Sequence, residues 1–521
     1  MFQKKIKRAC DKITDFGTGS HVLLLFVFLF LFAPLYAQAP ASANRMSLPR
    51  LESDPRALEF FELGVVQGGF TWENLAEISL WASGVDETAS LFERINVMAD
   101  AIKNSSDFPV GKREQAEFIL EYMHKNLLRS YVLTQTRMDT MFTTGRYNCV
   151  SSGVLYMILG KSVGLDISGV MTRDHAFVTV HIDGENIDVE TTNLHGFDPG
   201  NRRDSFDQFG RVTGYAYVPA RNYRDRQTIS PIELVSLILH NRIVEHETRN
   251  RFADVIPLAV DRAALLTGFV YNADGAIDTD TVVTDAIFED PQQYFMNRLF
   301  NFGAFLLNSG REEDCIYWAT HLTLVYPDET RWHEFIMKAV NNRIARYVRA
   351  GHLPDAKTFL AAQQTLLSSD EYTQLDSMLL DTELLEAANK ISTAAEGDRV
   401  LTAIEEARLS GRINERRASE LLIFAIRRTA SILSAAPARD WLAAIQYLQA
   451  AMARFGSNAE LAESLAAYQV NRARDFHNRF ATAYNRRDFD EAERVLNEGL
   501  AEFPDNRQLL ANRETLNRSR R

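Results

Sequence analysis

Hydrophobic and polar residues follow different patterns in the two halves of this chain. Over residues 48–140, apolar side chains recur at helical spacing. Within 115–128, for example, Phe118 and Tyr122 are four positions apart and share one face of a helix. The first half of the chain therefore predicts a lead-in of several amphipathic helices.

A more apolar helix is predicted next, over residues 149–159. Asn148 precedes it and belongs to the residue types whose side chains cap helix N-termini. Gly160 and Gly164 follow, and either glycine is a suitable end. Because its apolar positions are numerous, we expect this helix to be buried.

A β-hairpin is predicted after this helix. Residues 175–182 alternate between polar and apolar side chains, which is the period of a half-buried strand. Asp183 and Gly184 form a dipeptide that favours a two-residue turn, and apolar side chains then return up to Val189. A helix followed by a hairpin results.

From residue 231 onward, strand patterns nearly vanish and paired helices are predicted. Large and small residues recur there at positions that resemble the packing positions of tetratricopeptide (TPR) repeats. The positions are Phe476, Ala492, Leu496 and Gly499 in one copy and Leu299, Phe302, Gly303, Leu306 and Cys315 in another. The second copy makes Cys315 a packing residue. The spacing between copies is irregular, so an irregular helical bundle is the alternative.

The N-terminal segment carries an export pattern. Basic residues within 1–21 precede an uninterrupted apolar run of 12 residues over 22–33. This length suits a signal peptide and is short of the roughly 20 residues that span a bilayer. We expect cleavage after Ala37, or after Ala43 as second choice; the alternative is an inner-membrane anchor formed by 22–37. Either way we expect the body in the periplasm or cell envelope, with membrane contact only through this segment if it is uncleaved.

Length and composition set further limits. The chain of 521 residues is too long for one core, and the patterns divide it into 1–37, 38–230 and 231–521. A net charge of -12 disfavours a nucleic acid partner, and three cysteines are too few for a disulfide framework. No His-Glu-x-x-His motif is present, and no glycine-rich phosphate loop follows a predicted strand. We expect no metal and no cofactor.

Cys149 is the candidate nucleophile. A thiol reacts as the thiolate, which a helix N-terminus and a nearby imidazolium both favour. Cys149 would be the first residue of the capped helix, although a cysteine alone is more often a buried packing residue. His175 is the candidate base because it opens the strand beside the loop after this helix. His181 and His195 are weaker candidates.

The register of the hairpin selects the candidate acid. A two-residue loop pairs residues whose numbers sum to 367, so His175 faces Thr192. Asp188 and Glu190 both point to the same face as His175, but only Glu190 is a diagonal neighbour. We therefore expect Glu190 to be the acid. Asp188 is the second choice, because a bulge or a longer loop would shift the register and could bring Asp188 opposite His175.

Four short motifs carry a family resemblance. They are Asn148-Cys149-Val150-Ser151-Ser152, Gly164-Leu165, Asp174-His175-Ala176-Phe177-Val178 and Val189-Glu190-Thr191-Thr192. Together they resemble the transglutaminase-like branch of the papain-like cysteine fold over residues 100–230. Glu190 stands where many members have Asp, and Asp174 where Gly is frequent. The resemblance implies a helix carrying Cys149 packed on an antiparallel sheet carrying His175 and Glu190. With the repeat pattern after residue 231, the expected fold is α+β, a papain-like transglutaminase core followed by an all-α TPR-like solenoid.

The resemblance also implies a Cys-His-Glu triad that forms a thioester. The expected function is an exported hydrolase or acyltransferase for a peptide, protein or cell-wall peptide, with a protein partner on the TPR-like groove. The alternative is a catalytically silent scaffold in the cell envelope. Asn148, Tyr147 and Thr143 are the nearest candidates for a second oxyanion donor. Residues 198–211 mix both charges, which favours a solvated loop over a mobile flap.

Overall fold

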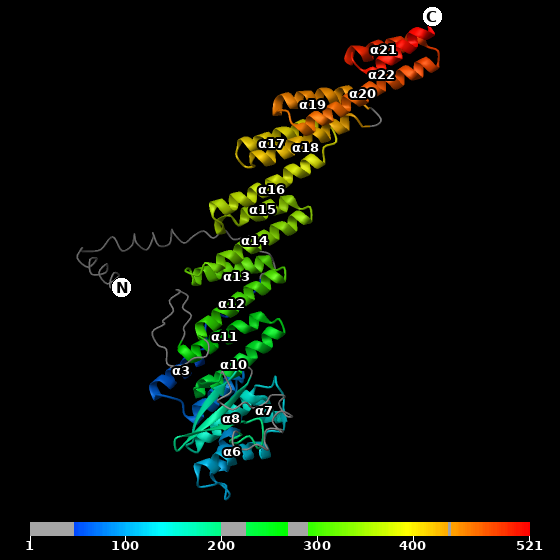
Figure 1. Ribbon diagram of the computed structural model, residues 1–521. Helices are drawn as coiled ribbons and strands as arrows, with labels where there is room; N and C mark the ends of the chain where they lie inside the picture. Colours follow the sequence, from blue (N-terminus) through cyan, green and yellow to red (C-terminus); the bar gives the residue numbers. More distant parts are fainter. Residues whose placement is uncertain (1–45, 174, 200–225, 269–289, 436–438, 521) are drawn as a thin grey trace, which may run out of the picture. The chain divides into compact units, whose positions relative to one another are not determined.

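The computed structural model describes residues 46–173, 175–199, 226–268, 290–435 and 439–520. Within these residues it contains 19 α-helices and a small antiparallel sheet of four strands, so the fold is mostly helical and of the α+β kind (Figure 1). All of these helices and strands lie in the compact unit Leu48–Arg521.

The predicted helical lead-in is present as five helices. Their bounds are α3 (Pro55–Gln67), α4 (Trp72–Ala82), α5 (Ala89–Lys103), α6 (Lys112–Asn126) and α7 (Met138–Thr144). Helix α6 covers most of the predicted range 115–128, and it begins earlier because Gly111 is its N-cap. Between α6 and α8, the two short strands β1 (Ser130–Tyr131) and β2 (Arg146–Tyr147) pair in parallel.

Helix α8 (Cys149–Ser162) begins where the sequence predicts and ends later. Asn148 Oδ1 accepts a hydrogen bond from the Ser151 amide, and the Ser151 side chain accepts one from the Asn148 amide. This reciprocal capping box fixes the start of the helix. Gly160 does not end it: a Cβ there would lie 2.3 Å from Ile167 Cδ1, so the glycine admits a close neighbour. Gly164, with φ of 82°, follows the end of the helix instead.

The four-stranded sheet contains the predicted hairpin and two more strands. Its strands are β3 (Asp166–Met171), β4 (Ala176–Ile182), β5 (Glu185–Val189) and β6 (Gln227–Ile229), in the order β5-β4-β3-β6. Val178 pairs with Val189 and Thr179 with Asp188, as the predicted register requires. Asp183 and Gly184 both have positive φ, 51° and 85°, which is the geometry of a type I′ turn. The register prediction is confirmed.

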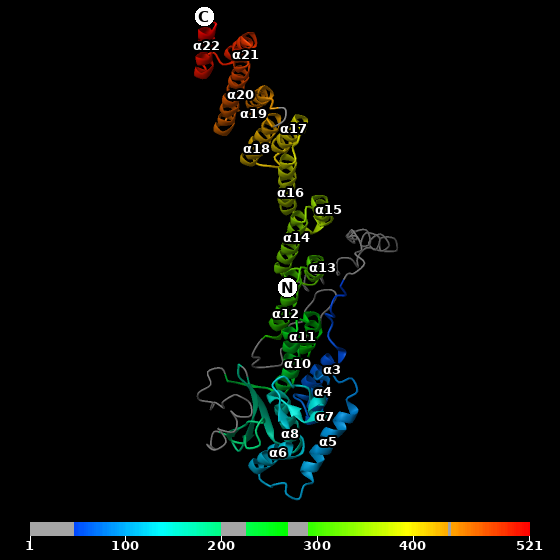
Figure 2. The same ribbon diagram turned by 90° about the vertical axis from the view of Figure 1, so that its right-hand side faces the viewer.

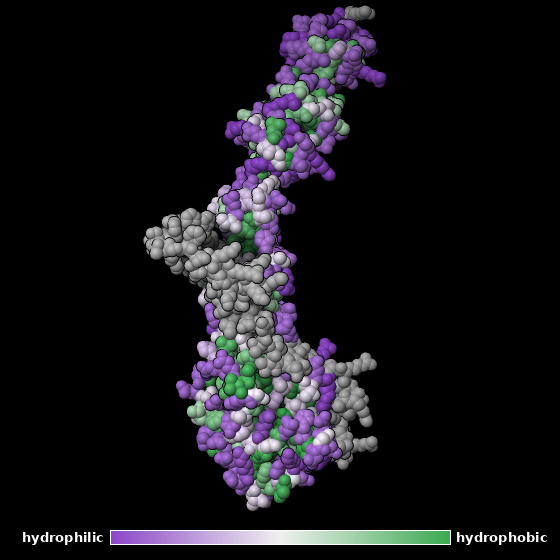
Figure 3. Space-filling model, turned by 90° about the vertical axis from the view of Figure 1, so that its left-hand side faces the viewer, coloured by the Kyte–Doolittle hydropathy of each residue, from purple (hydrophilic) through white to green (hydrophobic). Residues whose placement is uncertain are grey.

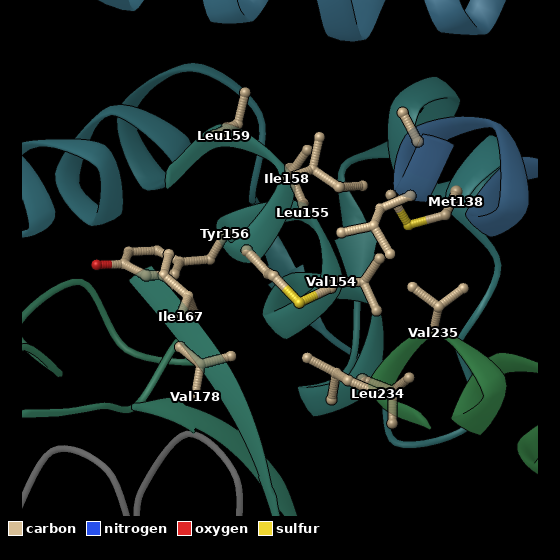
Figure 4. Packing of buried hydrophobic residues seen from close by; sticks show 14 of the residues in the cluster. Met138, Val154, Leu155, Tyr156, Ile158, Leu159, Ile167, Val178, Leu234 and Val235 are labelled. Atoms are coloured by element: carbon tan, nitrogen blue, oxygen red, sulfur yellow. The ribbon is translucent and has the colours of Figure 1, made fainter. Parts of the chain in front are cut away.

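Helix α8 lies at the centre of the main hydrophobic core. It contacts α4, α5, α6 and α10 on one side and strands β3 and β4 on the other (Figure 2). Figure 4 shows Tyr156 and Val154 of α8 among Ile167 and Val178 of the sheet and Leu234 of α10. The residues from Cys149 to Gly160 are all buried, which explains why the segment is apolar on every face.

The same core continues past residue 230, where the sequence places a domain boundary. Helix α10 (Pro231–Thr248) packs on α4, α8 and β3, and α11 (Phe252–Thr267) packs on α3. The core residues that these two helices add are Ile232, Leu234, Val235, Leu237, Ile238, Leu239, Ala264, Leu265 and Leu266. The first two helices after the boundary therefore share the core of the sheet region.

The remaining helices follow one another in packed pairs (Figure 1). Their bounds are α12 (Pro291–Asn308), α13 (Glu312–Val325), α14 (Arg331–Arg349), α15 (Leu353–Ala362), α16 (Ser369–Asn389), α17 (Ala394–Leu409), α18 (Glu415–Leu433), α19 (Trp441–Phe455), α20 (Ala459–Asn485), α21 (Phe489–Glu502) and α22 (Arg507–Ser519). A short 3₁₀ helix, η3 (Gln364–Leu366), follows α15. No described residue after β6 belongs to a strand.

Small residues allow close helix contacts at the predicted packing positions. A Cβ on Gly499 of α21 would lie 2.9 Å from the Phe476 ring of α20, so only glycine fits there. Cys315 of α13 is fully buried and lies 3.6 Å from the Gly303 carbonyl oxygen. Its burial, aided by Glu312, raises the pKa of the Cys315 thiol to about 12. Cys315 is therefore a packing residue and a poor nucleophile.

The surface of the helical pairs is largely polar. On the face drawn in Figure 3, hydrophilic residues surround small separate groups of hydrophobic ones over these helices. Among the described helices, none has the length and apolar composition of a membrane span. The predicted export segment over 1–37 and most of the predicted loop over 198–211 lie outside the described residues.

Candidate active site

Cys149 is the first residue of α8, at the buried end of the central helix. The side chain of Asn148 takes up the Ser151 amide, whereas the amides of Cys149 and Val150 have no carbonyl within the helix to bond. These amides and the helix dipole favour negative charge at the thiol or on an oxygen beside it. Cys149 is 8% exposed.

His175 joins Cys149 to Glu190. Its Nε2 lies 2.7 Å from Glu190 Oε2, and both residues are almost fully buried. Burial disfavours the charged ring, but the negative charge of Glu190 and hydrogen bonds with Cys149 and Glu190 outweigh it and hold the pKa of His175 well above its usual value. Nε2 is thus the ring nitrogen that faces the acid. The pairing that the hairpin register predicts is present.

The other predicted acid belongs to a different cluster. Both carboxylate oxygens of Asp188 accept hydrogen bonds from Arg226, at 2.8 and 2.6 Å, and Thr179 donates to Asp188 as well. The Arg226 guanidinium also lies over the Phe177 ring. Side chains alternate along the strands, so Asp188 lies on the same face of the sheet as His175. Its carboxylate nevertheless bonds to Arg226, which precedes β6, and not to the imidazole.

The two weaker histidine candidates have other surroundings. His181 bonds to Ser168 and Asn186 on neighbouring strands, at 2.9 and 2.7 Å. His195 is exposed in the loop after β5. Of the three histidines considered from the sequence, His175 is the one that meets the cysteine.

A set of hydrogen bonds that the sequence did not reveal ties the acid loop to α8. Ser152 Oγ and Thr191 Oγ1 are 2.9 Å apart, and the Tyr147 hydroxyl donates to the Thr192 carbonyl at 3.2 Å. His124 Nε2 lies 3.0 Å from the Thr191 carbonyl, and its burial lowers the pKa of His124, so the neutral ring donates there. The sequence offered one indication of these bonds: Ser152 and Thr191 place hydroxyl groups among buried apolar residues. Buried hydroxyl groups need hydrogen-bond partners.

The three side chains considered as second oxyanion donors are engaged elsewhere. Asn148 Nδ2 donates to the Leu133 carbonyl, and Thr143 Oγ1 donates to carbonyls within its own helix. Tyr147 donates to Thr192, and burial together with the Glu190 charge raises the pKa of Tyr147 to about 12. The amides at the start of α8 remain as the donors nearest the thiol.

Gly196 controls the loop that carries Glu190. The Glu190 amide donates to the Gly196 carbonyl, and a Cβ on Gly196 would lie 2.0 Å from the Glu190 carbonyl oxygen. We expect Gly196→Ala to lower the free energy of unfolding by about 2 kcal/mol or more, because backbone must move to admit the methyl group.

Urea unfolding followed by circular dichroism measures this effect. Gly153→Ala is the matched control, since a Cβ on that buried glycine of α8 would meet its nearest neighbour at an ordinary 3.8 Å. Equal unfolding midpoints for Gly196→Ala and the unmodified protein would show that the loop relaxes freely.

Comparisons with known proteins identify no family for this chain. No protein family model and no curated protein matches it. A crystal structure of menin, which reveals the binding site for the Mixed Lineage Leukemia (MLL) protein, is 14% identical over 82% of this chain and 94% of that chain, with a TM-score of 0.30. At this score the likeness carries no argument. Among the described residues, no group of three or more His, Cys, Asp or Glu side chains could hold a metal ion.

Proposed function

We propose that this chain is an exported cysteine-dependent hydrolase or acyltransferase with a transglutaminase-like core and a TPR-like helical region. Cys149 acts as the nucleophile, His175 carries the proton and Glu190 orients the imidazole. The observation that supports this best is the buried ring of His175, whose Nε2 lies 2.7 Å from Glu190 Oε2 and whose pKa the nearby Glu190 and Cys149 hold well above its usual value. Burying a carboxylate and an imidazole costs free energy, and such buried ionisable groups occur most often at functional sites.

In the proposed reaction, Cys149 Sγ attacks the carbonyl carbon of a peptide or amide. His175 takes the thiol proton and delivers it to the leaving nitrogen as the carbon–nitrogen bond breaks. Water or an amine then attacks the thioester carbonyl, the carbon–sulfur bond breaks, and His175 returns the proton of the attacking group to the sulfur. Water gives hydrolysis and an amine gives transfer. The amides of Cys149 and Val150 stabilise the oxyanion in both steps.

The rest of the chain supports a setting for this chemistry. The basic and apolar pattern of residues 1–37 is that of an export segment, so the substrate is a peptide, protein or cell-wall peptide met outside the cytoplasm. Helix pairs such as α20 and α21, packed through Phe476 on Gly499, stack into surfaces that hold protein partners. The proposal includes no metal, cofactor or nucleic acid.

Alkylation by iodoacetamide tests the proposal without a known substrate. A free thiol has a pKa of about 8.5 and is almost entirely protonated at pH 6. In protein that starts at residue 44, and so lacks Cys10, we expect Cys149 to react at pH 6 nearly as fast as at pH 8. His175→Ala should slow the reaction at pH 6 about 100-fold, because no imidazolium remains to stabilise the thiolate.

Two cysteine variants make the experiment specific. Cys149→Ala should abolish labelling, whereas Cys315→Ala should leave it unchanged, since burial holds the pKa of the Cys315 thiol at about 12. If Cys149 is inert, or reacts like a free thiol in both the unmodified protein and His175→Ala, the enzyme proposal fails. The near-complete burial of Cys149 favours the alternative in that case, a silent scaffold that binds protein partners.

A further inference from the structure

Glu190 divides its two carboxylate oxygens between two partners. Oε2 lies 2.7 Å from His175 Nε2. Oε1 accepts two hydrogen bonds from Thr192, one from its hydroxyl at 2.6 Å and one from its amide at 3.1 Å. Both donors of Thr192 therefore hold Oε1, the oxygen that does not face the imidazole. Together with the bond from Oε2 to His175, they fix the orientation of the carboxylate plane.

The position of Glu190 explains why the carboxylate has to be held. Strand β5 ends at Val189, so the sheet hydrogen bonds stop one residue before the acid. Glutamate also has one more side-chain torsion than aspartate, and fixing it loses conformational entropy. Because Glu190 is 1% exposed, water cannot replace a hydrogen bond that is removed there.

Thr192 is itself fixed relative to the nucleophile helix. Its carbonyl accepts the Tyr147 hydroxyl, and Tyr147 lies two residues before Cys149 in the chain. The preceding residue, Thr191, bonds to Ser152 in the first turn of α8. A rigid path of hydrogen bonds thus runs from the start of α8 through Thr192 to the carboxylate and on to His175.

We infer that Thr192 is a positioning residue of this site, which acts on His175 through Glu190 by means of its hydroxyl group. The inference rests on the proposed triad, because positioning matters only if the imidazole serves the thiol. Removing the hydroxyl makes the charged carboxylate less favourable and frees its torsion. The imidazolium then loses part of its stabilisation, and less thiolate forms near neutral pH.

The test compares three threonine variants in protein that starts at residue 44, as in the alkylation experiment above. Thr192→Val removes the hydroxyl and keeps the shape, and Thr192→Ser restores the hydroxyl. Thr179→Val is the matched control, because Thr179 also donates to a carboxylate of this hairpin, that of the half-buried Asp188, which bonds to Arg226 instead of His175. We expect Thr192→Val to slow alkylation of Cys149 at pH 6 about tenfold, the effect of one pKa unit, and the other two to react like the unmodified protein.

A second measurement separates this inference from the proposed function. In a Cys149→Ala background, NMR titration of the His175 ring should show its midpoint at lower pH for Thr192→Val, but not for Thr192→Ser or Thr179→Val. Unchanged titration and alkylation in Thr192→Val, or equal loss in Thr192→Val and Thr192→Ser, would overturn the inference. A Cys149 that reacts like a free thiol in unmodified protein overturns the proposed function instead, while the titration still decides the role of Thr192.

Discussion

A chain of residues 44–230 should fail to fold, whereas a chain of residues 44–268 should fold cooperatively. The shorter chain loses α10, whose apolar side chains complete the core around α8. Six of them are buried there, namely Ile232, Leu234, Val235, Leu237, Ile238 and Leu239. Each contributes about 2 kcal/mol on burial, so the loss of all six removes about 12 kcal/mol. That is comparable with the whole stability of a domain, about 5–15 kcal/mol.

Helix α11 adds polar contacts to the longer chain. Arg50 forms two hydrogen bonds with Asp261, at 3.1 and 2.8 Å, and the Asp54 amide bonds to the same carboxylate. These contacts tie the start of the described chain to α11 and hold α3 in place. The chain that ends at residue 268 keeps all of them. It loses the packing of α12 on α11 and the contacts of Tyr294 and Arg298 in α12 with His240 and Glu247 in α10.

Thermal unfolding followed by circular dichroism compares the two truncated chains with the full one. We expect a cooperative transition for 44–268, at a lower temperature than for the full chain, and none for 44–230. The alkylation assay gives a second readout, since a folded site in 44–268 keeps its reaction at pH 6. A cooperative transition in 44–230 would show that the sheet region is a domain that ends at residue 230.

Glu190→Gln should have the largest effect of any conservative substitution in the site. Glutamine keeps the size of the side chain but removes the charge that stabilises the imidazolium of His175. Its amide nitrogen would also bring a donor to the ring nitrogen that now donates to Oε2, which favours the opposite neutral tautomer. Without the Glu190 charge the imidazolium stabilises less thiolate, so alkylation of Cys149 at pH 6 should fall roughly 100-fold, the effect of about two pKa units.

The direction of the pH dependence follows from the raised pKa of His175. In the unmodified protein the imidazolium persists above the usual range, so the reactive ion pair spans neutral pH and is lost as pH rises through that pKa. In Glu190→Gln the pKa of His175 should fall, so the ion pair should be lost at a lower pH than in the unmodified protein. Asp188→Asn is the control, because that carboxylate bonds to Arg226 and Thr179 rather than to His175. Equal rates at pH 6 for Glu190→Gln and Asp188→Asn would contradict the role of Glu190.

Local sequence was enough to predict the elements that hold the nucleophile and base. The capping box of α8 joins Asn148 to Ser151, only three residues away, so its information lies in the sequence itself. The register of the hairpin depends on the Asp183-Gly184 turn, which fixes which residues of β4 and β5 face each other. Helix pairing after residue 231 could be predicted for the same reason, since small residues within a helix pair, such as Gly499, mark close contacts between neighbouring helices.

Contacts between distant segments decided the rest. Alternation along β5 leaves both Asp188 and Glu190 on the face of His175, and it is Arg226, 38 residues after Asp188, that bonds to the first acid. The bond of Ser152 to Thr191 spans 39 residues, and no local pattern encodes it.

The sequence by itself thus determined the start of α8 and the hairpin register, because the capping box and the Asp183-Gly184 turn each join residues a few positions apart. The register favoured Glu190 as the partner of His175, and the contacts of the folded chain decided between Glu190 and Asp188. Only the tertiary structure decided that Gly160 lies inside a helix, against Ile167, and that the core extends through α10. The apolar side chains of α10 have the periodicity of any buried helix. That periodicity does not indicate which helices or strands α10 packs against. Which surfaces meet is set by the packing of the whole core, so it emerges only when the chain is folded.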